Sequence, residues 1–181
     1  MLDFITEVDS FVYSQVSYLK SSFFEELFGY ITLLGGSYVA IFVLLLFLSW
    51  LFRRRQILIL YTFLFVFLLA EASSYLLKIA INRPRPETAM LKEFTPSFPS
   101  GHTLTATVLY GGIAVVLSWL VKRGLISKKR AAVLVSLLSA TVFLVGISRL
   151  YLGVHYFTDV AGGFLVGSLF VGILYFLCSK R

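Results

Sequence analysis

Charged residues are scarce in this sequence: Asp, Glu, Lys and Arg make up 14% of its 181 residues, whereas 59% are hydrophobic. Soluble domains carry about 25% charged residues, so this composition excludes an ordinary soluble domain and indicates a membrane protein. Cysteine occurs once, as Cys178. A single cysteine forms neither an intramolecular disulfide nor a thiolate metal cluster, so the fold depends on neither.

Long uncharged stretches locate the membrane spans, because a helix crossing the hydrocarbon needs about 20 mostly apolar residues. Four stretches qualify directly, and a fifth is equally apolar but contains Glu71 and Lys78. The sequence therefore predicts an all-α, polytopic membrane helix bundle, with residues 1–181 as one domain. Its expected spans are 27–52, 57–81, 103–121, 131–148 and 160–179.

The sequence predicts no secretory signal peptide, since the first residues are acidic rather than basic and no short apolar core follows them. Residues 2–22 instead have the pattern of an amphipathic helix. Such a helix lies in the membrane interface or packs on its own protein, and the pattern fits both. Its apolar face holds Ile5, Val8, Val12, Val16 and Leu19, and its polar face holds Asp3, Glu7, Ser10, Ser14, Ser17 and Ser21.

The net charge of +7 marks membrane topology rather than a nucleic-acid surface, because most basic residues fall in alternate loops. By the positive-inside rule these loops are cytoplasmic. We therefore expect a multi-pass protein of the cell (inner) membrane, with its N-terminus outside. The cytoplasmic group is Arg53, Arg54, Arg55, Lys122, Arg123, Lys128, Lys129, Arg130, Lys180 and Arg181; the outer group is Lys20, Lys78, Arg83, Arg85, Lys92 and Arg149.

Prolines are few, and all four lie between the second and third predicted spans, in residues 82–102. Each interrupts helix and restricts the backbone, which predicts a structured outer loop of the kind that often carries function. This loop and residues 148–159 together contain both histidines of the chain. Glycine pairs within the spans, by contrast, are typical of close helix packing.

Three outer cations are spaced to bind one phosphoryl group. Lys78 and Arg85 lie two helical turns apart, although the prolines take Arg85 out of the helix before it points inward. With Arg149 they offer two forked donors and one point charge to an anion. Residues 100–102, Ser-Gly-His, directly precede the third span, whose helix N-terminus also favours an anion.

His155 and Asp159 lie four residues apart. If this segment is helical, the carboxylate lies one turn from the imidazole and orients it. Each polar residue has an ordinary explanation when taken singly, such as a cation at the membrane interface or Asp159 as a helix cap. Their convergence on one face of the membrane favours a common site.

These residues resemble the three-part signature of the type 2 phosphatidic acid phosphatase family, whose active-site pattern is shared by vanadium haloperoxidases and bacterial acid phosphatases. The motifs match without departure across residues 78 to 159. Members commonly have six spans, whereas five are expected here. The matched residues are Lys78, Arg85 and Pro86 in the first motif, Pro99, Ser100, Gly101 and His102 in the second, and Ser148, Arg149, His155 and Asp159 in the third.

The resemblance implies a metal-independent phosphatase without a cofactor. His155 would be the nucleophile that forms a phosphohistidine, Asp159 would orient it, and His102 would be the general acid. The phosphate would be bound by Lys78, Arg85, Ser100, Gly101 and Arg149, with Pro86, Pro99, Ser148 and Arg83 in support.

The resemblance leaves the substrate open among lipids with a terminal phosphoryl group. Candidates are phosphatidylglycerol phosphate, undecaprenyl diphosphate, phosphatidic acid and lipid A phosphate, bound at the extracytoplasmic surface without an obligate protein partner. A phosphotransferase with the same histidine is the alternative. A small transporter is a third hypothesis, in which Glu71 is the coupling residue; otherwise Glu71 forms a hydrogen bond to Ser73, Ser74 or a neighbouring helix.

Overall fold

The computed structural model describes residues 2–87, 89–91 and 94–180. All regular structure in these residues is helical, as expected. The predicted outer cation Lys92 lies outside the described residues. The elements are α1 (Leu2–Tyr18), α2 (Ser22–Thr32), η1 (Leu33–Gly35), α3 (Ser37–Arg53), α4 (Ile57–Ile81), α5 (Gly101–Ala106), η2 (Thr107–Gly111), α6 (Gly112–Lys122), α7 (Lys128–Tyr151) and α8 (Phe157–Ser179).

Four helices are long and apolar enough to cross a membrane: α4, α7, α8 and the continuous helix Gly101–Lys122, which comprises α5, η2 and α6. The sequence predicts one further span over 27–52, but the structure has two helices there that meet at 47°. The break follows from packing. A Cβ built on Gly35 would lie 2.6 Å from Cγ1 of Val145 and 2.8 Å from the carbonyl of His102, so only glycine fits. Gly36 is then extended, and α3 starts anew.

The helix Gly101–Lys122 lies at the centre of the bundle, and α8 packs closely on it. The close approach of these two helices depends on glycines of α8. A Cβ on Gly163 would lie 2.8 Å from the carbonyl of Ser100, and one on Gly167 would lie 2.7 Å from Cβ of Thr107. Bulkier residues would push these helices apart. Glycine therefore brings the start of α8 against the start of α5, where residues of the second and third motifs meet.

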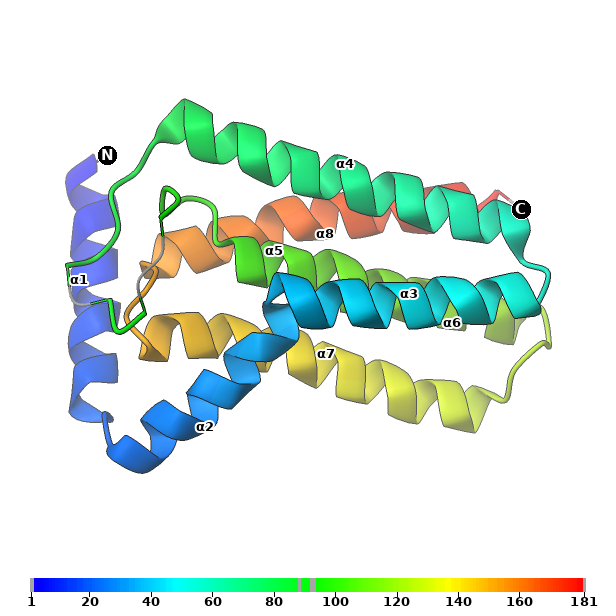
Figure 1. Cartoon of the computed structure of the whole chain (residues 1–181), viewed down its shortest axis with the longest axis horizontal. Coiled ribbons are helices and arrows are strands. Elements are labelled where there is room, and N and C mark those ends of the chain that lie inside the picture. The colour runs from blue at the N-terminus through cyan, green and yellow to red at the C-terminus, as the bar shows by residue number, and fades with distance from the viewer. Residues whose placement is uncertain (1, 88, 92–93, 181) are drawn as a thin grey trace.

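The two ends of the bundle differ in chemistry (Figure 1). At one end lie the α3–α4 and α6–α7 connections and the C-terminal end of α8. Basic residues predicted to be cytoplasmic gather there, with Arg53 ending α3, Lys122 ending α6 and Lys128 beginning α7. At the other end, residues 82–87 and 94–100 and the α7–α8 connection lie together, and α1 crosses them. All three sequence motifs meet at this second end.

Candidate active site

His155 lies between α7 and α8, where Tyr156 caps α8. Asp159, in the first turn of α8, accepts the backbone N–H of Tyr156 at 2.9 Å through Oδ2, and this oxygen lies 3.5 Å from Nδ1 of His155. The pair therefore meets as the spacing predicts but for another reason: His155 precedes the helix, and Asp159 turns back as part of a capping box. Both side chains are buried.

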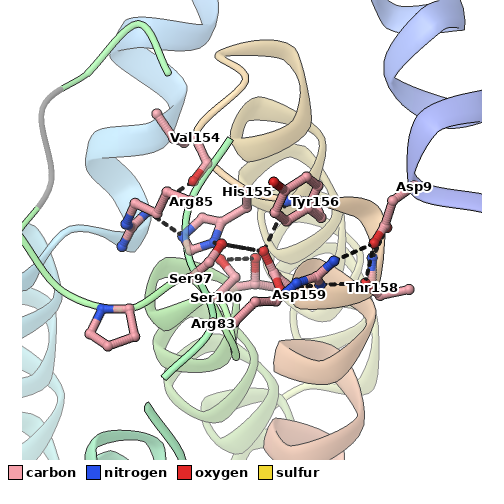
Figure 2. A network of polar contacts seen from close by, with 12 residues as sticks. Asp9, Arg83, Arg85, Ser97, Ser100, Val154, His155, Tyr156, Thr158 and Asp159 are labelled. Carbon is pink, nitrogen blue, oxygen red and sulfur yellow. Dashed lines mark hydrogen bonds and ion pairs between the residues drawn. The ribbon is translucent and has the colours of Figure 1, made fainter. Parts of the chain in front are cut away.

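Ser97 completes the surroundings of Asp159 (Figure 2). Its hydroxyl donates to Oδ2 of Asp159, and its oxygen lies 3.4 Å from Nδ1 of His155. The other carboxylate oxygen, Oδ1, accepts a hydrogen bond from Nη1 of Arg83 at 2.7 Å. Asp159 is thus held on both oxygens, so its position beside the imidazole is fixed.

Arg85 fixes the tautomer of His155. Helix α4 ends at Ile81, Asn82 adopts a left-handed conformation with φ 45°, and the chain then turns Arg85 toward the α7–α8 connection. Nη1 of Arg85 donates to the carbonyl of Val154 at 2.9 Å and lies 3.2 Å from Nε2 of His155. Because a guanidinium only donates, Nε2 presents its lone pair and Nδ1 carries the proton that faces Asp159.

Arg149 lies in the last turn of α7 and is 0% exposed. Its Nη1 donates to the hydroxyl of Thr32 at 2.7 Å, so α2 contributes to this part of the site. Arg149 and Arg85 both lie near enough to His155 to disfavour its cationic form. The two guanidinium groups thus place positive charge beside the imidazole, where an anion would be stabilised.

The remaining predicted residues line a neighbouring cavity of about 280 Å³, bounded by α4, α5 and the start of α3. Lys78, Gly101 and His102 lie in its wall. Nζ of Lys78 donates to the carbonyl of Pro96 at 2.7 Å. Thr95, also in the wall, accepts through its carbonyl from Nε of Arg85 at 2.7 Å, which connects the cavity to the histidine.

Glu71 also lies in the wall of the same cavity. It accepts a hydrogen bond from the hydroxyl of Thr105 at 2.7 Å, so it pairs with a neighbouring helix, which is one of the partners expected from sequence. Ser100 is buried at the start of α5, and its hydroxyl accepts from Thr103 at 3.0 Å. Its backbone N–H donates to the carbonyl of Asp159 at 3.0 Å, which ties the second motif to the third.

The supporting residues have structural surroundings. Ser148 is fully buried and donates to the carbonyl of Val145 at 2.6 Å within its own helix. Pro99 is buried directly before α5, and Pro86 is half-buried after Arg85. The structure gives Arg83 more contacts than the sequence suggests, because it joins Asp159 to Asp9 on α1.

Sequence reasoning missed Ser97, Thr32 and Asp9. Ser97 and Thr32 carry no distinguishing signal, since each serves the site only through tertiary contacts. Asp9 does carry one: it lies four residues after Ile5 and three before Val12, on the apolar face of the amphipathic helix. An acidic residue on an apolar face needs a partner when buried, and that partner is Arg83.

Burial lowers the pKa of His155 from its ordinary 6.5 to about 4, and Arg149 and Arg85 add to the shift, while Asp159 opposes it. A depressed pKa keeps the imidazole neutral at pH values above it, with its lone pair available. We therefore expect the ring resonances of His155, in ¹⁵N-histidine-labelled protein in detergent, to titrate near pH 4. The chain has two histidines, so a His102→Gln variant assigns them. A midpoint near 6.5 would contradict this prediction.

Comparisons with known proteins agree with these observations. The model of the PAP2 superfamily matches residues 59–181, which include all three motifs. Phosphatidylglycerophosphatase B of Bacillus subtilis (strain 168) is 44% identical over 94 residues, which cover 51% of this chain and 45% of that protein. The matched segment thus spans less than half of this relative.

Two solved structures share the fold. One is the crystal structure of a transmembrane PAP2 type phosphatidylglycerolphosphate phosphatase from Bacillus subtilis, with a TM-score of 0.87, 30% identity, and coverage of 97% of this chain and 87% of that chain. The other is LpxE of Aquifex aeolicus, with a TM-score of 0.69, 26% identity and coverage of 90% and 91%. The resemblance seen in the three motifs is thereby confirmed, and the chain belongs to the PAP2 superfamily.

Proposed function

We propose that this protein is a membrane lipid phosphatase that hydrolyses a terminal phosphate through a phosphohistidine at His155. The observation that carries the proposal is the pair of contacts of this imidazole: Nδ1 lies 3.5 Å from Oδ2 of Asp159, and Nε2 lies 3.2 Å from Nη1 of Arg85, which only donates. A nucleophile needs such an unprotonated, oriented nitrogen. The neighbouring guanidinium groups supply the positive charge that a phosphoryl group requires.

In the first step, Nε2 of His155 attacks phosphorus and the bond from phosphorus to the lipid oxygen breaks. His102, in the wall of the adjoining cavity, donates the proton that the leaving oxygen takes up. Arg85 exchanges its contact with Nε2 for contacts with the phosphoryl oxygens, alongside Lys78 and Arg149. Asp159 stabilises the positive charge that His155 acquires.

In the second step, water replaces the lipid. His102, now deprotonated, accepts a proton from the attacking water, the P–N bond breaks, and inorganic phosphate leaves. His155 returns to its neutral form. The three cations remain the charge partners of the phosphoryl group throughout, so the proposed reaction uses no metal ion.

Among the candidate lipids we favour phosphatidylglycerol phosphate. A curated relative and a solved structure, both from Bacillus subtilis, are named for this activity. The cavity beside His102 is lined by hydroxyl and carboxyl groups, including Ser74, Thr105 and Glu71. Such groups suit a leaving group with hydroxyls of its own, such as a glycerol head group, better than a purely apolar one.

Phosphate release from the four candidate lipids by purified protein in detergent tests this proposal. We expect phosphatidylglycerol phosphate to be hydrolysed fastest, with activity that survives EDTA and is inhibited by vanadate, because protein cations balance the phosphoryl charge. Loss of activity in EDTA that added metal restores would contradict the mechanism. Transfer of phosphate to another lipid, without free phosphate, would indicate a phosphotransferase instead.

We also propose that the site faces the extracytoplasmic side, because the basic residues gather at the opposite end of the bundle. A cysteine at Glu87, exposed in the outer loop, is expected to react with a membrane-impermeant thiol reagent in intact cells, whereas one at Ser127 is not. Native Cys178 is 1% exposed and is replaced by alanine in both variants. The reverse labelling would place the site in the cytoplasm.

A further inference from the structure

Asp9 is a buried carboxylate on an otherwise peripheral helix. It is 4% exposed, although α1 crosses the end of the bundle and Phe4 and Phe11 on the same helix are 68% and 65% exposed. A buried carboxylate is costly unless charged and polar partners surround it. The surroundings of Asp9 therefore indicate what holds it there.

Both oxygens of Asp9 are bonded to residues next to the catalytic pair (Figure 2). Oδ2 accepts from Nη2 of Arg83 at 2.7 Å and from the hydroxyl of Thr158 at 2.8 Å. Oδ1 accepts the backbone N–H of Thr158 at 2.9 Å. Asp9 thus binds the first turn of α8, one residue before Asp159, and pairs with the same arginine.

The planar guanidinium group of Arg83 has hydrogen-bond partners along two of its edges and an aromatic ring against one face. Its Nη1 donates to Oδ1 of Asp159 and to the hydroxyl of Thr158, both at 2.7 Å. Its guanidinium carbon lies 4.1 Å from the centre of the Tyr156 ring. Asp9 occupies the remaining edge, so the guanidinium has one orientation in which all its partners are satisfied.

The orientation of the Arg83 guanidinium determines which hydrogen-bond partners each carboxylate oxygen of Asp159 has. Oδ1 faces Arg83, which leaves Oδ2 for Tyr156 N–H, Ser97 and Nδ1 of His155. Without the charge of Asp9, Arg83 has Asp159 as its one carboxylate partner among the described residues. The guanidinium then turns toward Asp159 and competes for the oxygen that orients the imidazole.

We propose that Asp9 is a positioning residue for the reaction, which acts on His155 through Arg83 and Asp159. This inference rests on the proposed role of His155 as the nucleophile. A misplaced reacting atom lowers the attack rate strongly, by about 100-fold for 1 Å. Loss of Asp9 is therefore expected to lower kcat rather than raise KM, because Asp9 is not among the residues that line the cavity.

The test compares Asp9→Asn with Glu7→Gln. Both changes remove one negative charge from α1, but Glu7 is exposed. Asp9→Asn should lower kcat about tenfold or more, with KM within about twofold, because a displaced reacting atom slows the attack. The ring ¹⁵N resonances of His155 should shift while those of His102 stay, and Glu7→Gln should leave kcat and both spectra unchanged.

A double variant separates positioning from folding. In an Arg83→Gln background Asp9 is no longer linked to Asp159, so adding Asp9→Asn should change kcat by less than about twofold. If the two residues acted independently, their effects on kcat would multiply. An unchanged His155 spectrum and kcat in folded Asp9→Asn, or multiplicative effects in the double variant, would overturn the inference. Failure of the proposed function is distinguishable, because wild-type protein would then form no phosphohistidine while the spectral shift in Asp9→Asn persisted.

Discussion

His155→Ala is expected to abolish hydrolysis of both a natural lipid phosphate and nitrophenyl phosphate, by on the order of 10⁴-fold or more in kcat/KM. No leaving group compensates for a missing attacking atom. His102→Ala is the matched comparison. A lipid alkoxide must be protonated as it leaves, whereas a nitrophenolate leaves without an acid, so this variant should lose far more activity on the lipid.

Phosphate release from the two substrates by both variants, together with acid-labile labelling of the protein by ³²P-substrate, makes the distinction. The label should be absent from His155→Ala. Both variants need a thermal unfolding measurement in detergent, since His155 is 4% exposed. If folded His155→Ala still hydrolyses the nitrophenyl ester well, the roles of the two histidines are reversed.

Arg85→Ala is expected to lower kcat/KM by about 10²–10³-fold, the cost of removing one preorganised donor from a developing charge. The loss has two causes. In the proposed mechanism Arg85 contacts the phosphoryl group, and it also holds Thr95 and Val154 around the site. Arg85→Lys keeps the positive charge but lacks the forked N–H donors of a guanidinium, so its activity should lie between those of Arg85→Ala and wild type.

The control for this prediction is Lys129→Ala, which removes an equal charge from an exposed position at the opposite end of the bundle. Its kcat/KM should match wild type. Equal losses in Arg85→Ala and Lys129→Ala would indicate a long-range effect of net charge and contradict a local role. Measurement at two salt concentrations adds a check, because long-range effects are screened by salt.

Sequence reasoning anticipated the helical membrane bundle, because uninterrupted apolar stretches are a property of the chain itself. It also anticipated that His155 and Asp159 meet and that Arg85 leaves α4 before it points inward. His155 and Asp159 meet through a capping box at the start of α8, and prolines follow the end of α4 where Arg85 leaves it. Local chemistry sufficed for them.

Other features depend on contacts between distant segments and could not be read from local pattern. Residues 27–52 are uniformly apolar, so nothing in their hydropathy predicts the 47° bend. The bend requires Gly35 to pack on Val145 and on the backbone of His102. Ser97 resembles any loop serine until α8 brings Asp159 to it. A pattern identifies candidate residues, whereas packing decides which of them meet.

The contacts of Asp9 have a consequence for biosynthesis. The carboxylate lies on the first helix, and its partner Thr158 lies at the start of α8, 149 residues later in the chain. A ribosome has therefore synthesised α1, Arg83, Arg85 and most of the bundle before the residues that complete the candidate site exist. Nascent protein that has not yet inserted the start of α8 contains Lys78, Arg85 and Arg149 but lacks the contact of Asp159 with the proposed nucleophile His155. Catalytic competence thus arises late, at the step when the newest segment docks against the oldest.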